Sequence, residues 1–201
     1  RPCNDVTVTL GHVSTLAESL FGDTTSFGTW EDRGAYSTGG ETYHIYEKQM
    51  HAEVRAGTHL GTAGGNPGQW ALDIGVYDTR ASSGTAANPA RWRNSRYSMA
   101  VCALDYYESG AVASQLSALL DREPIPGDTH PCGQVLQDVP GTAHGCWFRE
   151  GIAETYPEDN HLALVWSNTR PSQAVLSVGS TVATVPSRAY PFVPQASGRL
   201  N

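Results

Sequence analysis

His12 and Asp73 are the residues of this 201-residue chain whose side chains could together do chemistry. An imidazole and a carboxylate can move a proton, bind a metal ion, or form a hydrolase triad with a nucleophile such as Ser14. The chain lacks the G-x-S-x-G turn that presents such a nucleophile in α/β-hydrolases. We therefore assign no catalytic residues, and treat His12 and Asp73 as remnant candidates.

Seven histidines could supply metal ligands, but no two have H-x-H or H-x-x-x-H spacing. They are His12, His44, His51, His59, His130, His144 and His161. The acidic residues also lack the alternating pattern of a calcium loop. They include Glu31, Asp32, Glu154, Glu158 and Asp159. We expect these side chains to be solvated, and we predict no metal and no other cofactor.

The elements that must position His12 begin at the N-terminus. Residues 4–10 alternate apolar and polar side chains, which predicts a half-buried strand. Apolar residues then recur at helical spacing over 13–21, which predicts a short helix ended by Gly22. The composition of 23–41 (Thr, Ser, Gly and Asp) predicts a long loop.

A glycine-rich stretch, residues 54–78, must position Asp73. We expect a hairpin with a turn at Ala56–Gly57, a loop rich in glycine, and a buried strand over 70–77. The loop glycines are Gly61, Gly64, Gly65 and Gly68.

The rest of the chain predicts further strands and one longer helix. The apolar run 99–107 predicts a buried strand, and the spacing of apolar residues over 110–122 predicts a helix. Short strands are expected later, among them 161–166 and 174–178. The fold class is therefore mainly β, a sandwich or barrel of antiparallel strands with two short helices, about 13–21 and 110–122. We predict one β domain over 1–123, and a β-rich extension over 124–201 with an extended proline-rich tail.

The two motifs together resemble the lysostaphin-type zinc murein endopeptidases and their non-enzymatic relatives. The resemblance rests on Gly11-His12-Val13-Ser14, on a V-x-x-G-x-x-L-G-x-x-G hairpin from Val54 to Gly64, and on the strand 71–76. It covers about residues 4–78. It implies a β scaffold of the LytM type, in which His12 matches a histidine that acts on the attacking water and the oxyanion.

The zinc ligands that the resemblance implies are replaced in this chain. Ala71 and Asp73 occupy the positions of the two histidines in the H-x-H strand of the family, and the upstream H-x-x-x-D pair is missing. A catalytic zinc needs about three protein ligands. The resemblance therefore indicates a degenerate scaffold. It also implies that earlier strands of the family fold are missing, so that a partner chain could complete the N-terminal β edge.

Composition and cysteine content suggest the compartment. The net charge of −7 disfavours a nucleic-acid partner, and no apolar run is long enough to span a membrane. Four cysteines without C-x-x-C spacing predict two disulfides, which we expect to be Cys132–Cys146 and Cys3–Cys102. Disulfides favour an oxidising setting, extracellular, at the cell surface or periplasmic.

Three functions remain open. The first is a secreted non-catalytic protein with a structural or binding role in an extracellular or cell-surface assembly, by self-association or with a partner chain. The second is a metal-dependent cell-wall hydrolase. The third is a glycan- or peptide-binding module with Trp70, Gly64, Gly65 and Gly68 at its site. Exposed aromatic rings can stack on sugars, although many in β proteins are core or interface anchors. Those considered are Trp30, Tyr36, Trp70, Trp92, Tyr106, Tyr107, Trp147 and Trp166.

Overall fold

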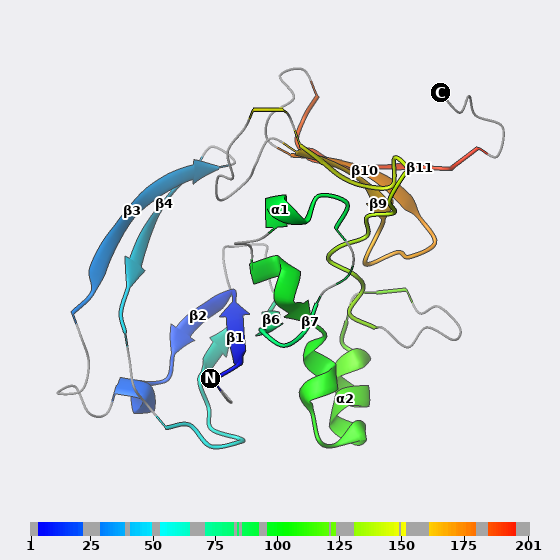
Figure 1. The fold of residues 1–201 in the computed structure, drawn as a ribbon. Coiled ribbons are helices and arrows are strands. Elements are labelled where there is room, and N and C mark those ends of the chain that lie inside the picture. The colour runs from blue at the N-terminus through cyan, green and yellow to red at the C-terminus, as the bar shows by residue number, and fades with distance from the viewer. Residues whose placement is uncertain are drawn as a thin grey trace. The chain divides into compact units, whose positions relative to one another are not determined.

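A computed structural model gives the fold of the chain (Figure 1). It describes residues 4–21, 29–38, 41–49, 53–64, 71–82, 84, 86–92, 96–120, 122–123, 131–148, 150–151, 161–179 and 185–195. These residues form mainly strands in antiparallel sheets, so the predicted mainly-β class is confirmed. The finer prediction of a sandwich or barrel stays a prediction.

The chain divides into two compact units. Unit 1 contains residues 1–9 and 74–201, and unit 2 contains residues 10–73. The buried apolar side chains of the described residues all belong to unit 1: Val6, Val76, Leu136, Ala163, Ala174, Val175 and Val178. The predicted domain division at residue 123 stays a prediction.

One sheet has the order β1-β6-β7, and the unit boundary cuts it near the ends of β1 and β6. The strands are β1 (Val6–Gly11), β6 (Asp73–Asp78) and β7 (Ala100–Val101). β1 confirms the first predicted strand, and the strand expected over 70–77 corresponds to β6. The amide of Thr79 donates to the carbonyl of Asp5 at 3.0 Å, which extends the contact beyond the paired residues.

The larger sheet of unit 1 has the order β11-β10-β9-β8, and Figure 1 labels β9, β10 and β11. Its strands are β8 (Gly145–Phe148), β9 (His161–Trp166), β10 (Ala174–Val178) and β11 (Arg188–Phe192). The predicted strands 161–166 and 174–178 are confirmed at their predicted bounds. β11 carries Pro191 at a sheet edge, where a missing amide breaks no ladder inside the sheet.

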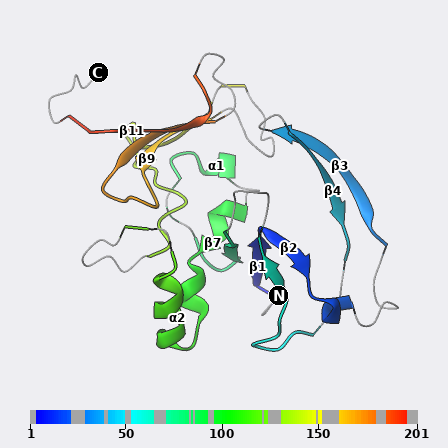
Figure 2. The same cartoon turned by 180° about the vertical axis from the view of Figure 1, so that it is seen from behind.

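Unit 2 contains two separate strand pairs. β2 (Val13–Leu16) pairs with β5 (Gly61–Ala63), and β3 (Glu31–Thr38) pairs with β4 (Glu41–Glu47). Figure 2 shows β3 and β4 as a long two-stranded ribbon. The ribbon carries a stacked pair of rings, Tyr36 and Tyr43, with centroids 5.4 Å apart.

Two predictions for unit 2 are wrong. The helix expected over 13–21 is strand β2 followed by the 3-10 helix η1 (Glu18–Phe21). Pairing with β5 outweighs the helical spacing, because Ser14 and Thr15 both bind the hydroxyl of Thr62 across the strands. The loop expected over 23–41 contains β3.

The connection from β6 to β8 contains several short helices. It contains α1 (Pro89–Trp92), the 3-10 helices η3 (Arg96–Met99) and η4 (Ala103–Tyr106), and α2 (Gly110–Ser117). The strand expected over 99–107 is wrong except at β7, since η4 turns the chain so that Tyr106 reaches Asp78. The helix expected over 110–122 is confirmed as α2, with an earlier end.

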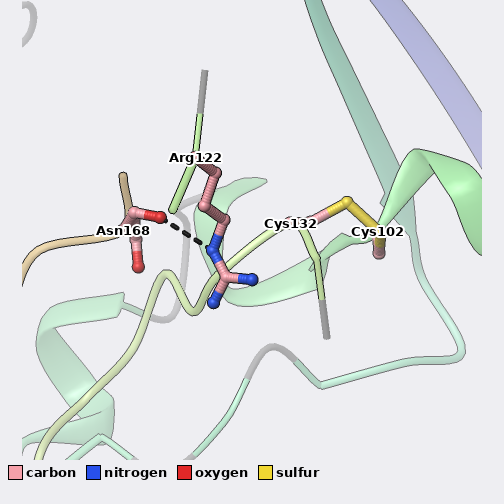
Figure 3. The surroundings of a disulfide bond; sticks show 4 residues. All are labelled: Cys102, Arg122, Cys132 and Asn168. Atoms are coloured by element: carbon pink, nitrogen blue, oxygen red, sulfur yellow. Dashed lines mark hydrogen bonds between the residues drawn. A yellow bond between two sulfur atoms is a disulfide. The ribbon is translucent and has the colours of Figure 1, made fainter. Parts of the chain in front are cut away.

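A disulfide joins Cys102 to Cys132, with their Cα atoms 5.4 Å apart (Figure 3). Both predicted pairings are therefore wrong. Cys146 has a free thiol, and Cys3 lies outside the described residues. Sequence spacing favoured the short loop between Cys132 and Cys146, but Cys146 lies within β8, where its amide binds the carboxylate of Asp138. No helix in the described part of the chain is long and apolar enough to cross a membrane.

Candidate functional site

The imidazole of His12 and the carboxylate of Asp73 meet in unit 2. His12 lies between β1 and β2, and Asp73 is the first residue of β6. His12 Nε2 lies 3.1 Å from Asp73 Oδ2. Gly11 allows this approach, because a Cβ at that position would come within 3.2 Å of the Asp73 Cβ. The two remnant candidates, 61 residues apart in sequence, are thus direct partners.

The backbone at His12 is in the left-handed region, with φ of 56°. A side chain other than glycine is uncommon in this conformation, which costs roughly 1–2 kcal/mol. The carbonyl of His12 accepts the amide of Gly64 at 2.8 Å, and this bond helps to hold the turn. The bend aims the imidazole toward Asp73, whose side chain is 69% exposed against 31% for His12.

The hydroxyl of Ser14 does not join the pair. It donates to the carbonyl of Thr62 at 3.2 Å and lies 3.0 Å from the Thr62 hydroxyl. Gly64 also lies against this hydroxyl, because a Cβ at Gly64 would come within 2.9 Å of Ser14 Oγ. Ser14, His12 and Asp73 therefore do not form a nucleophilic triad, in which the serine must bind the histidine.

A catalytic zinc of the family type does not fit this donor set. His12 and Asp73 supply two ligands at most, and they bind each other. In the described part of the chain, no three His, Cys, Asp or Glu side chains cluster in a way that could hold a metal ion. Three protein ligands and an open position are the usual minimum for a catalytic zinc.

The other predicted site residues are placed as follows. Among the remaining histidines, His44 lies on β4 and His161 begins β9, His59 and His144 lie between elements, and His51 and His130 lie outside the described residues. Of the predicted ligand-binding residues, Gly64 is buried beside β2, and Gly65, Gly68 and Trp70 lie outside the described residues. The glycine-loop site therefore stays a prediction.

Sequence analysis missed a buried carboxylate, Asp78, at the end of β6. It accepts two hydrogen bonds from the Arg80 guanidinium, at 2.9 and 2.7 Å, and one from the Tyr106 hydroxyl at 2.6 Å. The hydrogen bonds from Arg80, and then that from Tyr106, hold the pKa of Asp78 far below its ordinary value. The same contact, with burial, raises the pKa of Tyr106. This set fixes η4 to β6, and the Asp-x-Arg spacing was its only local signal.

A second buried carboxylate, Asp138, organises the segment before β8. It accepts the amides of Ala87 and Cys146, each at 2.9 Å. Gly145, with φ of 132°, leaves room for it, since a Cβ there would come within 2.4 Å of Asp138 Oδ1. Burial, and then the charge of Asp138, raises the pKa of the Cys146 thiol to about 11. These contacts stabilise the fold and leave the thiol mainly protonated at neutral pH.

An open hollow of about 400 Å³ lies beside β10 and β11 in unit 1. Its charged side chains are Glu123 and Arg170, whose nearest charged atoms are 3.9 Å apart. Both are more than half exposed. The residues that line the hollow belong to unit 1, whereas His12 and Asp73 belong to unit 2.

No protein-family model, curated protein or solved structure matches this chain. The resemblance to the lysostaphin-type endopeptidases therefore stays a prediction.

Proposed function

We propose that this chain is a non-catalytic β protein that acts by binding, as part of an extracellular or cell-surface assembly. Its scaffold would be that of a metallopeptidase whose metal ligands have been replaced.

The contact between His12 and Asp73 carries this proposal. If His12 corresponds to the histidine of the family that acts on the attacking water, its imidazole should face a metal-bound water. It contacts Asp73 at 3.1 Å instead. A histidine engaged with a carboxylate in this way orients the turn between β1 and β2, and Ser14 is engaged by Thr62. His12 and Asp73 thus bind each other, and Ser14 binds Thr62, so all three side chains have structural partners.

The free edge of β1 supports a binding role. β1 is an outer strand of the described β1-β6-β7 sheet, so one row of its amide and carbonyl groups has no strand beside it there. Val8 and Leu10 on this strand are 44% and 38% exposed. Extended edges with apolar side chains add strands from other chains. A partner strand, from a second copy or another protein, would complete this edge.

The Cys102–Cys132 disulfide supports the proposed compartment. Disulfides persist in secreted and surface proteins and are rare in a reducing cytosol.

Metal content and hydrolytic activity test the proposal. The purified protein is dialysed against zinc-containing buffer, freed of excess metal, and analysed by mass spectrometry for bound metal. Release of dye-labelled fragments from murein is measured in parallel. We expect less than a stoichiometric amount of metal and no release above buffer.

Two aspartate variants make this test specific. Asp73→Ala removes the partner of His12, whereas Asp105→Ala removes an exposed carboxylate of η4. One equivalent of zinc that Asp73→Ala loses and Asp105→Ala keeps would establish the hydrolase alternative instead. Sedimentation velocity over a range of concentrations tests self-association, and a strict monomer would leave only a heterologous partner for β1.

A further inference from the structure

We propose that one face of the β8–β11 sheet binds an uncharged or weakly anionic oligosaccharide through exposed aromatic rings. This inference deepens the binding role proposed above and rests on it. We call the surface the tryptophan face. It consists of Gly145, Trp147, Leu162, Leu164, Trp166, Ala174, Leu176, Val178, Arg188, Tyr190 and Phe192.

The strand register assigns these residues to one face. Successive side chains of a strand alternate between faces, and directly paired residues share a face. The opposite face carries Phe148, whose ring packs edge-on against Trp92 of α1 with centroids 5.8 Å apart. Arg91 of α1 also lies over the Phe148 ring, at 4.4 Å. α1 therefore packs against the opposite face at its β8 end.

Two exposed rings flank a small residue on the tryptophan face. Ala174 of the central strand β10 pairs with Trp166 on one side and with Phe192 on the other. Trp166 is 41% exposed and Phe192 40%, while Ala174 is 5% exposed. Two strand spacings separate the rings' Cα atoms, about 10 Å. The result is a row with two aromatic walls and a methyl group between them.

The rows beside this one extend the apolar surface. Leu176 is 37% exposed and lies next to the aromatic row on β10. Trp147, on the edge strand β8, is 53% exposed, and its indole N–H donates to the carbonyl of Ala143 at 2.9 Å. That hydrogen bond restrains the orientation of the indole. An extended ligand could therefore contact a third ring beyond the first row.

The charge of the face selects the class of ligand. None of its residues is acidic, although the chain as a whole has a net charge of −7. The carboxylate of Asp138 lies against Gly145, but it is buried and accepts two backbone amides. The one cation of the face is Arg188, which lies 4.4 Å from the centre of the Tyr190 ring. Single-stranded nucleic acid also stacks on aromatic rings, but it needs a basic groove that this face does not provide. An uncharged or weakly anionic ligand meets no repulsion here.

The size of the face favours a small ligand over a protein. Four strands at about 4.8 Å and five residues at about 3.3 Å span roughly 300 Å², and the buried Gly145, Ala174 and Val178 leave only part of this area accessible. A stable protein interface buries about 800 Å² on each partner. A sugar ring needs far less area. Its C–H groups are weakly positive and are attracted to the negative face of an aromatic ring, while its hydroxyls stay in water.

Binding to a panel of polysaccharides tests the proposal. Insoluble cellulose, chitin and murein sacculi are used in pull-downs of the whole chain, and soluble oligomers of any polysaccharide that binds are titrated by calorimetry. We expect binding to at least one member, with an affinity that Trp166→Leu lowers about tenfold. Trp166→Phe retains a flat ring and should keep most of the affinity, which separates stacking from simple apolar contact.

A matched control locates the site. Trp30 is 56% exposed and does not belong to the tryptophan face, so Trp30→Leu should bind like the wild type. Far-ultraviolet circular dichroism checks that each variant folds. Binding that Trp30→Leu loses and Trp166→Leu keeps would overturn the assignment of the site. If the wild type binds no polysaccharide of the panel, the proposed ligand class is wrong. Neither result would support the metal-dependent hydrolase.

Discussion

Removal of the Cys102–Cys132 disulfide should destabilise the chain by an amount that its loop length predicts. The two cysteines are 30 residues apart. In the chain-entropy relation, a closed loop of this length restricts the unfolded chain by about 12 cal/mol/K, or about 3.6 kcal/mol at 25 °C. The double variant Cys102→Ser/Cys132→Ser should lose this amount in its free energy of unfolding.

The loss should appear first in the helices inside the loop. The loop contains η4 and α2. No residue of α2 is buried, and the side chain of Ser109 makes no capping hydrogen bond. Packing and capping therefore contribute little to the stability of this helix. Figure 3 also shows Arg122, just beyond α2, whose Nε donates to the carbonyl of Asn168 at 2.9 Å. Without the disulfide, this bond and that from the amide of Glu123 to the carbonyl of Thr169, at 2.8 Å, still connect the end of the loop to the segment after β9.

Urea denaturation followed by circular dichroism at 222 nm measures the effect. With a slope of about 2 kcal/mol/M, the loss corresponds to a midpoint lower by roughly 2 M. Cys146→Ala is the control, because it removes a cysteine without opening a loop, and it should cost less than about 1.5 kcal/mol. A double variant within about 1 kcal/mol of the wild type, or a Cys146→Ala loss as large as that of the double variant, would refute the reasoning.

Three further predictions concern single residues. The His12→Gly variant should be more stable than His12→Ala by about 1 kcal/mol in urea denaturation. Both variants lose the imidazole, but only alanine is strained by a φ of 56°. Equal stabilities would mean that the backbone of the turn relaxes in the alanine variant. The Cys146 thiol should react with iodoacetamide about 100-fold more slowly at pH 8 than a thiol with the ordinary pKa of 9.0, because burial raises its pKa to about 11. Peptide mapping gives the rate of alkylation, and a rate like that of an ordinary thiol would contradict the burial of Cys146. The pKa of Asp78 is lowered in the folded state, so its ionised form stabilises the fold above the ordinary value of 3.8, and this contribution is lost as the pH falls below it. Asp78→Asn should therefore be less stable than the wild type at pH 7, with a gap that narrows steadily below pH 3.8, and a gap independent of pH would exclude this origin.

The local sequence pattern was sufficient to predict strands that are half buried in a sheet. β9 and β10 were predicted at their observed bounds, because each is a compact run of β-formers and Arg170-Pro171 marks the turn between them. The start of α2 was also predicted, since Ser109 and the apolar spacing after it mark a helix.

Pattern failed where pairing with a distant segment decides the structure. Val13–Leu16 has helical spacing but becomes a strand because it meets β5, which sequence periodicity cannot show. In the sequence, Glu31–Thr38 looks like a loop because most of its residues are polar or charged. It nevertheless pairs with β4, and Arg33 of this strand binds Glu47 across the ribbon. Long-range pairing is not encoded in a local window.

The candidate site was predicted in part. The proximity of His12 and Asp73 followed from the motifs, whereas the left-handed turn at His12 and the direct contact required coordinates. The carboxylates of Asp78 and Asp138 were missed, because burial of an acid is visible only once its donors, Arg80 and the amide of Cys146 among them, are in place.

The course of the chain through unit 1 has a consequence for evolution. β1 and β6 are neighbours in one sheet, yet residues 12–72 lie between them in the sequence. His12 and Asp73 lie at the two ends of this segment, and their side chains are in contact, so the contact joins the ends of the segment. Because the entropy of closing a loop grows only logarithmically, doubling the length of this segment would cost about 0.6 kcal/mol. Insertions and deletions between His12 and Asp73 should therefore cost little through chain entropy, and β1 and β6 can stay paired when this segment changes length.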